Sequence, residues 1–553
     1  MLTYTPKSAY PFDTPREYPW ALLLMVFVWL WPGVFSHDLW NPREPNLYQV
    51  IETFTNNPSH LPMLFENTAF DVAPVYVWLA ALLQKYFTPL IDVYAAARIT
   101  SVVFTSIGLL ASGMAAYRLL GTKHQGRSAV LILIGSVGLL PITHFINDFS
   151  VLFAGASLVW WAFSVARKQL VFAVLLNVLG LLLLMQAAGL ILPLLLLLGA
   201  ALLAQHPLWA SKRITVFWVG SLLLSAPLMA AYLQALWLVN PNTFHIYFNQ
   251  FLWGDFGGVK HFQAGFSLGY YVQQLLWFAF PALPLALWTA KCMRLGQSDF
   301  GVLSFIWLGL TGLFLSLLPT QNQDYLVVLL PVLATLGAAQ LDYLRRGVAA
   351  FLNWFGIMIF GLAALFLWIG FMAMNFGFPA KLAERAAYFS PYYTRDIDVL
   401  PILFALLFTP VWLIAINRKR IRGRQAITNW AAGVTLVWAL LHTLFLPWID
   451  AAKSHRPIVQ QMQNKLPENL IAQLTQQNEC LYIAPDETIT RIAWQQYSDL
   501  PLNSQNNHCR YQLTRQIGKT FRQPEHTQII WQGNRPRNKD EHFVLLEHLS
   551  INH

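Results

Sequence analysis

A short segment that begins at residue 37 gathers the side chains most able to do chemistry. Residues 37–48 read HDLWNPREPNLY and hold His37, the acids Asp38 and Glu44, and Arg43 among aromatic residues. A carboxylate can act as a general base, and a cation can stabilise negative charge that develops during a reaction. The segment follows an apolar run, so we expect it at a membrane surface. On spacing alone, Arg43 and Glu44 could instead form a charge pair in a solvated loop.

Two further acids lie beside apolar segments. Asp71 precedes the aromatic stretch 74–78, and Asp148 lies between two apolar segments that almost no loop separates. Charges near the bilayer are expensive, which makes such acids candidates for a functional site. Asp148 could instead cap the helix that follows it. Asp38, Glu44 and Asp148 offer the oxygen ligands that Mg²⁺ prefers, but no spacing indicates that they converge. We therefore expect no cofactor and no divalent metal.

The composition predicts an integral membrane protein, whose elements must position these residues. Of 553 residues, 56% are apolar and 11% are charged, whereas soluble domains carry about a quarter charged residues. Apolar blocks of about twenty residues can cross about 30 Å of hydrocarbon. A soluble enzyme is thereby excluded. The thirteen candidate spans lie at about 20–36, 96–117, 128–146, 149–166, 170–186, 188–204, 214–238, 268–290, 300–318, 325–341, 349–373, 398–416 and 427–447.

The basic residues predict the orientation of this domain, residues 1–450. Segment 74–87 holds fourteen residues and ends in Gln84 and Lys85, which favours an interfacial helix within an outer-face loop at 37–95. With that assignment, 18 basic residues lie on one side, among them the run 418–424, and 6 on the other. The positive-inside rule then places the N-terminus in the cytoplasm of a multi-pass inner-membrane protein. The net charge of +10 could suggest nucleic-acid binding, but because the basic residues mark orientation we expect no nucleic acid and only contact with anionic membrane lipid on the cytoplasmic side.

The tail, residues 451–553, predicts a small soluble α/β domain in the periplasm. It is rich in Gln, Asn and His, and its histidines lack the spacing of metal ligands. Cys480 and Cys509 would lie in an oxidising compartment, where a disulfide between them can form. Apolar periodicity predicts strands at 480–484, 528–532 and 543–547 and a helical region at 457–476.

Several motifs occur in the order typical of one enzyme family. They are Pro42-Arg43-Glu44-Pro45, the stretch 70–78 (FDVAPVYVW), Ala96-Ala97-Arg98-Ile99-Thr100-Ser101, Asp148, Asn240–Phe244 with Tyr247-Phe248, and 319–331 with Asp324-Tyr325-Leu326. This series resembles the GT-C glycosyltransferases that use polyprenyl-phosphate sugars, in the branch of lipid A aminoarabinose transferases and protein O-mannosyltransferases. The resemblance covers residues 20–450. It implies an all-α polytopic GT-C-like fold of about 13 transmembrane helices, followed by a small C-terminal α/β extracytoplasmic domain.

The resemblance also implies a reaction. An inverting transferase of this kind moves one hexosyl or pentosyl sugar from a polyprenyl-phosphate donor to a lipid A, glycan or protein acceptor at the periplasmic face. We expect Glu44 to be the base or the group that orients the acceptor, with Asp148 as the second carboxylate. The expected substrate-binding residues are the cations Arg43, Lys85 and Arg98, the acid Asp71, and the aromatic residues Tyr76, Trp78 and Tyr325, of which Trp78 could instead belong to an interfacial aromatic belt.

Some charged residues typical of the family are absent. Arg43 stands where the family has an Asp, and Val72 stands where it has a Lys. The lost groups include cations expected to hold the lipid phosphate, and Arg43 could replace one of them in space. Two hypotheses therefore remain: a transferase, or a catalytically diverged protein on the same fold that binds or transports lipid-linked sugars.

Overall fold

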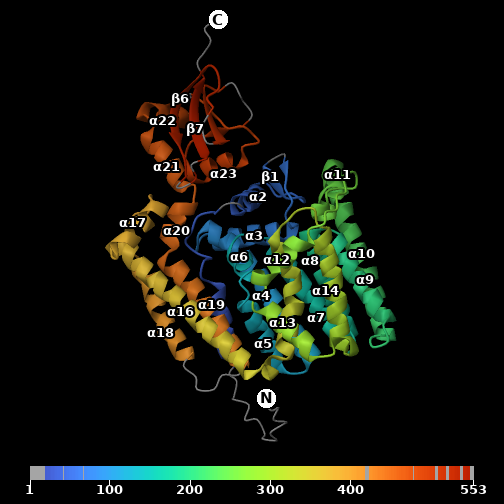
Figure 1. Cartoon of the computed structure of the whole chain (residues 1–553). Coiled ribbons are helices and arrows are strands. Elements are labelled where there is room, and N and C mark those ends of the chain that lie inside the picture. The colour runs from blue at the N-terminus through green and yellow to red at the C-terminus, as the bar shows by residue number, and fades with distance from the viewer. Residues whose placement is uncertain are drawn as a thin grey trace.

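The computed structural model describes residues 19–40, 43–65, 68–395, 397–416, 423–476, 479–504, 509–518, 522–535, 538 and 540–548. These residues form a bundle of helices with a small sheet domain at one end (Figure 1). Several residues used in the sequence analysis lie outside the described residues, namely Pro42, His508, His553 and most of the basic run 418–424.

Every predicted span overlaps one helix or two consecutive helices. Within the described ranges, seven helices are long and apolar enough to cross a membrane, and α12 with α13, bent by 100°, makes an eighth if the pair is one span. Several of the others are shorter apolar helices, so the count of thirteen stays a prediction. The helices are α1 (Pro19–Leu30), α4 (Val93–Leu120), α5 (Lys123–Ile134), α6 (Leu139–His144), α7 (Phe149–Val165), α8 (Leu170–Ala188), α9 (Ile191–Gln205), α10 (Lys212–Val239), α12 (Leu268–Phe278), α13 (Ala282–Cys292), α14 (Asp299–Leu317), η3 (Gln323–Leu329), α15 (Leu330–Ala339), α16 (Arg346–Phe376), α18 (Val399–Ile416) and α19 (Gly423–Leu444).

Small residues let the central helices α4, α7 and α8 pack closely. A Cβ atom on Gly108 of α4 would lie 2.4 Å from the ring of Phe153 on α7. Between α7 and α8, a Cβ on Gly155 would lie 3.1 Å from the carbonyl oxygen of Gly180. Close backbone approach of this kind is how helices associate in lipid, where burial of apolar surface gives no driving force. The resulting rigid core supports the short elements at the ends of the helices.

The predicted outer-face loop contains two helices and a hairpin. These are α2 (Glu44–Asn56), β1 (Met63–Phe65), β2 (Thr68–Ala69) and α3 (Pro74–Phe87), and α3 has the bounds predicted for the interfacial helix. In Figure 1, α2, α3 and β1 lie at the end of the bundle that faces the sheet domain. The remaining connecting elements are α11 (Pro241–Asn249), η1 (Phe251–Phe256), η2 (Leu295–Gln297), η4 (Leu341–Tyr343), α17 (Ala380–Phe389) and α20 (Leu446–Lys453).

The tail folds as the small α/β domain that the sequence predicts. Its sheet has the order β4-β3-β5-β7-β6, with β3 parallel to β4 and β5, and β7 antiparallel to β5 and β6. The three predicted strands are present, whereas α23, β4 and β5 were not predicted. The elements are α21 (Arg456–Lys465), α22 (Glu468–Thr475), β3 (Leu481–Tyr482), α23 (Thr488–Tyr497), β4 (Leu502–Asn503), β5 (Tyr511–Ile517), β6 (Thr527–Gly533) and β7 (Glu541–His548).

A disulfide joins Cys480 to Cys509, as the sequence allows. The two cysteines are 29 positions apart, and closing a loop of about this length stabilises a domain by about 3 kcal/mol, chiefly by restricting the unfolded chain. We expect the Cys480→Ser/Cys509→Ser variant to raise amide hydrogen exchange in β5 and β7 about a hundredfold, measured by mass spectrometry on the purified chain. Cys292→Ser, which removes an exposed free cysteine, is the matched control. Unchanged exchange in β5 and β7 would contradict the prediction.

Candidate active site

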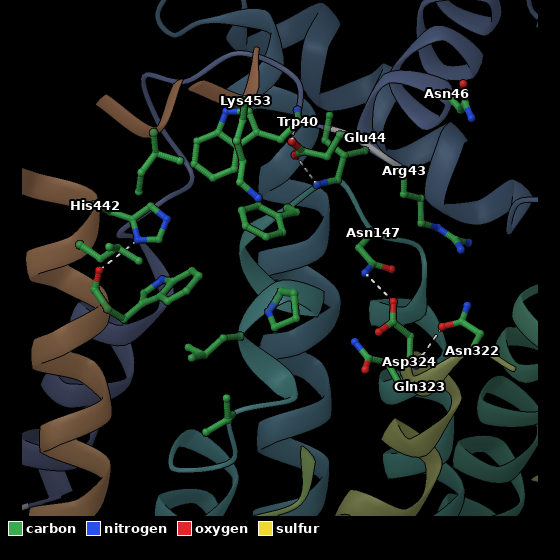
Figure 2. Close-up of a pocket in the computed structure, with 18 of the residues that line it drawn as sticks. Trp40, Arg43, Glu44, Asn46, Asn147, Asn322, Gln323, Asp324, His442 and Lys453 are labelled. Carbon is green, nitrogen blue, oxygen red and sulfur yellow. Dashed lines mark hydrogen bonds between the residues drawn. The ribbon is translucent and has the colours of Figure 1, made fainter. Parts of the chain in front are cut away.

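A cavity of about 810 Å³ opens between α6, α12, α19 and α20 on one side and the loop after α1, α2 and η3 on the other. Figure 2 shows polar side chains gathered on one flank, with His442 on the opposite flank. We call the first flank the polar wall; it comprises Arg43, Asn46, Asp71, Asn147, Asn322, Gln323 and Asp324. The apolar wall comprises Val137, Leu140, Trp277, Trp438, Leu441 and Ile449.

Glu44 begins α2 and is buried at the edge of this cavity. Its carboxylate accepts hydrogen bonds from Arg98 Nε and from the backbone N–H groups of Trp40 and Ile146, each at 2.9 Å. Burial is the largest single influence and disfavours the charged carboxylate. The charge of Arg98, the nearby His37 and the hydrogen bonds to the carboxylate together outweigh burial and hold the pKa of Glu44 below its usual value. Glu44 therefore stays ionised, with its oxygens already engaged by donors.

Arg98 is the other half of this network. It is 0% exposed and donates to the backbone carbonyls of His37 and Asp38 at 3.0 and 2.8 Å, besides its bonds to Glu44. All three guanidinium nitrogens are thereby used. The sequence hypothesis gave Arg98 to the substrate phosphate, but the structure instead makes it the centre that holds the loop after α1 against α4.

Arg43 and Asp148 form a second ion pair, at 2.6 Å. The other Asp148 oxygen accepts a hydrogen bond from the Ala73 backbone N–H at 3.3 Å, and its side chain makes no capping bond to α7. The Arg43 guanidinium lies 4.7 Å from the centroid of the Phe149 ring. Its side chain is 35% exposed, so Arg43 can reach a ligand in the cavity. Arg43 and Glu44 thus have separate partners and do not pair with each other.

Asp71 is the carboxylate most open to the cavity. It follows the β1–β2 hairpin, is exposed on the polar wall, and accepts no hydrogen bond from any described residue. The protein around Asp71 displaces water that would hydrate the charged carboxylate, and this desolvation is the main cause that raises its pKa from 3.8 to about 7. The negative charges of Asp255 and Asp148 raise the pKa further, and Arg43 opposes the shift. A carboxylate that titrates near neutral pH is suited to accept a proton.

The neighbouring Asp255 is positioned by a close backbone contact between η1 and the end of α8. Gly189 and Gly254 have φ of +73° and +58°, and a Cβ on Gly254 would lie 2.6 Å from the carbonyl oxygen of Ala188. Only glycine combines an unstrained positive φ with the absence of a Cβ atom at this close backbone contact. Asp255 also accepts a hydrogen bond from the Thr320 hydroxyl. The sequence analysis did not predict Asp255 as part of the site, and its only signal was the glycine that precedes it.

Two further charged residues of the cavity were not assigned a role from the sequence. Asp324 accepts a hydrogen bond from Asn147 Nδ2 at 3.4 Å; it was quoted only as part of a motif. Lys453, in the last turn of α20, lines the cavity from the end nearest the soluble domain, and its side chain points inward in Figure 2. No motif marked Lys453, because it lies after the last span.

Besides Arg98, four predicted binding residues do not line the cavity. Tyr76 is buried, and its hydroxyl bonds Ser101 Oγ at 2.8 Å, so it supports the turn before α7 from below. Trp78 packs against Tyr232. Tyr325 is buried against aromatic neighbours, and Lys85 is exposed in the last turn of α3. The predicted role of these four residues in substrate binding therefore has no support from the lining of the cavity.

The acids weighed as magnesium ligands do not meet. Asp38 binds Arg456 of the soluble domain at 2.5 Å, while Glu44 binds Arg98 and Asp148 binds Arg43. Among the described residues, no three His, Cys, Asp or Glu side chains are grouped to hold a metal ion. The three ion pairs instead fasten the loop after α1 to the soluble domain, to α4 and to the start of α7.

The fold is the GT-C fold of membrane glycosyltransferases. In particular, the chain is similar to ArnT from Cupriavidus metallidurans, an aminoarabinose transferase. The apo crystal structure has a TM-score of 0.60 at 15% identity, covering 95% of this chain and 97% of that one. The structure bound to undecaprenyl phosphate has a TM-score of 0.59 at 15% identity, covering 95% and 96%. No family sequence profile and no curated protein matches the chain. The predicted GT-C resemblance is confirmed at the level of fold.

Proposed function

We propose that this protein transfers a single sugar from a polyprenyl-phosphate donor to a lipid A, glycan or protein acceptor at the outer face of the membrane. The observation that carries the proposal is the cavity, in which an apolar wall faces a polar wall that holds Arg43 and the two carboxylates Asp71 and Asp324. An isoprenoid chain and a phosphate-linked sugar need these two surfaces side by side. The bound undecaprenyl phosphate in ArnT, which has the same fold, supports the donor class.

In the proposed reaction an acceptor hydroxyl attacks the anomeric carbon of the donor sugar. The oxygen–carbon bond forms as the bond from that carbon to the phosphate oxygen breaks, which inverts the carbon. Asp71 takes the hydroxyl proton, and the electron pair leaves with the lipid phosphate. Arg43 stabilises the charge that develops on this phosphate, since a fixed cation in a partly enclosed site is worth more than one in water. Asp148 holds Arg43 in place.

The geometry favours Asp71 over Glu44 as the base. Glu44 already accepts bonds from Arg98 and two backbone donors, and its lowered pKa weakens it as a proton acceptor. Asp71 is open to the cavity and has a pKa raised to about 7. We therefore assign Glu44 to positioning of the loop and Asp71 to proton transfer, and Asp148 to positioning of Arg43.

Transfer should depend on pH through Asp71. Only the ionised carboxylate accepts a proton, so with a pKa of about 7 the active fraction falls as the pH drops below 7. We expect kcat/KM to rise about thirtyfold from pH 5.5 to pH 8, in proportion to the ionised fraction of Asp71. Asp255→Asn removes a neighbouring negative charge, which should lower the pKa of Asp71 and shift the rise in kcat/KM, the acidic limb of the pH profile, to lower pH. A flat profile over this range in the native protein would contradict the assignment.

The function is tested in a deletion strain of the source organism. Mass spectrometry of lipid A, other envelope glycans and glycoproteins should show one species that lacks a single sugar. The gene for the native chain should restore that species. An unchanged set of glycoforms in the deletion strain, with the lost protein verified in the parent membranes, would contradict a role as a glycosyltransferase.

A further inference from the structure

Two strongly basic side chains line the cavity within the described part of the chain, Arg43 and Lys453. Arg43 is paired with Asp148 at 2.6 Å, so that pair is close to neutral as a unit. The polar wall also carries the acids Asp71 and Asp324. A phosphate entering this cavity therefore meets more negative than positive charge unless Lys453 takes part. No described carboxylate is paired with the exposed ammonium of Lys453.

The helix α20 presents Lys453 in a setting that fits the junction of a lipid and its phosphate. Ile449 and Lys453 are four residues apart, so they lie on one face of α20, and both line the cavity. Ile449 belongs to the apolar wall, and Lys453 follows it toward the soluble domain. One helical turn thus offers an apolar contact and then a cation, in the order of an isoprene unit and the phosphate attached to it.

The position of Lys453 is set by hydrogen bonds of residues that precede and follow it in the chain. Asp450 accepts hydrogen bonds from Trp40 Nε1 at 2.8 Å and from the Asp38 backbone N–H at 3.0 Å. Ser454, the residue after Lys453, donates a hydrogen bond from its hydroxyl to the Asp38 carboxylate at 2.7 Å. Arg456 donates two hydrogen bonds to the same carboxylate, at 2.5 and 2.8 Å. Docking of the soluble domain therefore fixes the backbone that carries Lys453.

We propose that Lys453 binds the phosphate of the polyprenyl-phosphate lipid, so that the tether of the soluble domain forms part of the donor site. This inference rests on the proposed function. Lys453 supplies a second cation to a cavity in which Arg43 is the other strongly basic side chain among the described lining residues. Arg43 and Lys453 contact the phosphate from different sides, and the apolar wall receives the isoprenoid.

The test is lipid binding to the purified full chain in detergent, with undecaprenyl phosphate and undecaprenol as probes. Lys453→Gln should weaken binding of undecaprenyl phosphate about tenfold to a hundredfold, because a charge-assisted hydrogen bond is lost. Binding of undecaprenol should not change. Lys453→Arg should retain affinity within about threefold, since the charge is kept. Lys465→Gln, at another exposed lysine in the last turn of a helix, is the matched control.

The outcomes separate this inference from the proposed function. If the native chain prefers undecaprenyl phosphate over undecaprenol and Lys453→Gln keeps that preference, the role of Lys453 is overturned while the proposed function stands. If Lys453→Gln loses affinity for both lipids equally, the effect is not on the phosphate and the inference also fails. If the native chain shows no preference, both proposals fail. Inorganic phosphate alone should bind far more weakly; equal affinity would overturn the lipid as the source of the phosphate.

Discussion

Asp71→Asn should lower the rate of sugar transfer about a hundredfold to ten-thousandfold, the usual contribution of a positioned base. Asparagine has nearly the same shape as aspartate but cannot take a proton at neutral pH. Asp71 is exposed to the cavity and accepts no hydrogen bond from the described residues, so the fold should be unaffected. The measurements are the abundance of the sugar-bearing product by mass spectrometry and the affinity for undecaprenyl phosphate, which should stay within about threefold of native because no donor contact is removed.

The matched control is Asp499→Asn, which removes an exposed carboxylate of the soluble domain outside the cavity. Transfer at the native rate by Asp71→Asn would contradict its role as base and would favour a phosphate acceptor, which is already ionised. Donor binding without any transfer by the native chain itself would favour the alternative of a diverged lipid-sugar binding protein. These outcomes separate the two hypotheses that the loss of family cations leaves open.

The GT-C resemblance and the soluble domain could be predicted because their signals are local. Apolar blocks mark spans, strand periodicity marks β6 and β7, and the fold matches that of a solved structure at only 15% identity. The partners of the charged residues could not be predicted, because pairing joins distant positions. Glu44 and Arg98 are 54 positions apart in the sequence, and Arg43 and Asp148 are 105 positions apart.

The roles of individual acids also depend on solvent access, which no motif encodes. Glu44 lies in the motif and is buried within a saturated network, whereas Asp71 is open to the cavity. Arg43 and Glu44 are adjacent in sequence, yet the start of α2 turns one toward Asp148 and the other toward Arg98. The sequence predicts a loop and a set of acids for the site, and the folded chain distinguishes the acids that face the cavity from those that are buried.

Arg98→Met should destabilise the protein by about 3–5 kcal/mol, the cost of leaving one member of a buried ion pair without its partner. Glu44 would remain buried with a charge that only backbone donors oppose. The single variant Glu44→Gln should also lower the free energy of unfolding. The double variant Glu44→Gln/Arg98→Met should lower it by less than the sum of the two single variants, because the double variant leaves no buried charge. Thermal unfolding of the purified chain measures all three variants. Strict additivity of the losses would contradict coupling between the two side chains.

A parallel activity measurement decides what Glu44 does. If Glu44 is a positioning residue, Glu44→Gln should lower transfer only as far as it lowers the amount of folded protein, and the pH limb near 7 should survive in what remains. If Glu44 is the base, Glu44→Gln should abolish transfer in chains that still unfold as cooperatively as the native protein. Arg510→Gln, which breaks the exposed pair with Glu547 at 2.6 Å, should leave both readouts unchanged, because a solvated ion pair contributes little. Together, the stability and transfer measurements on Glu44→Gln distinguish a residue that holds the loop in place from a base that takes the proton.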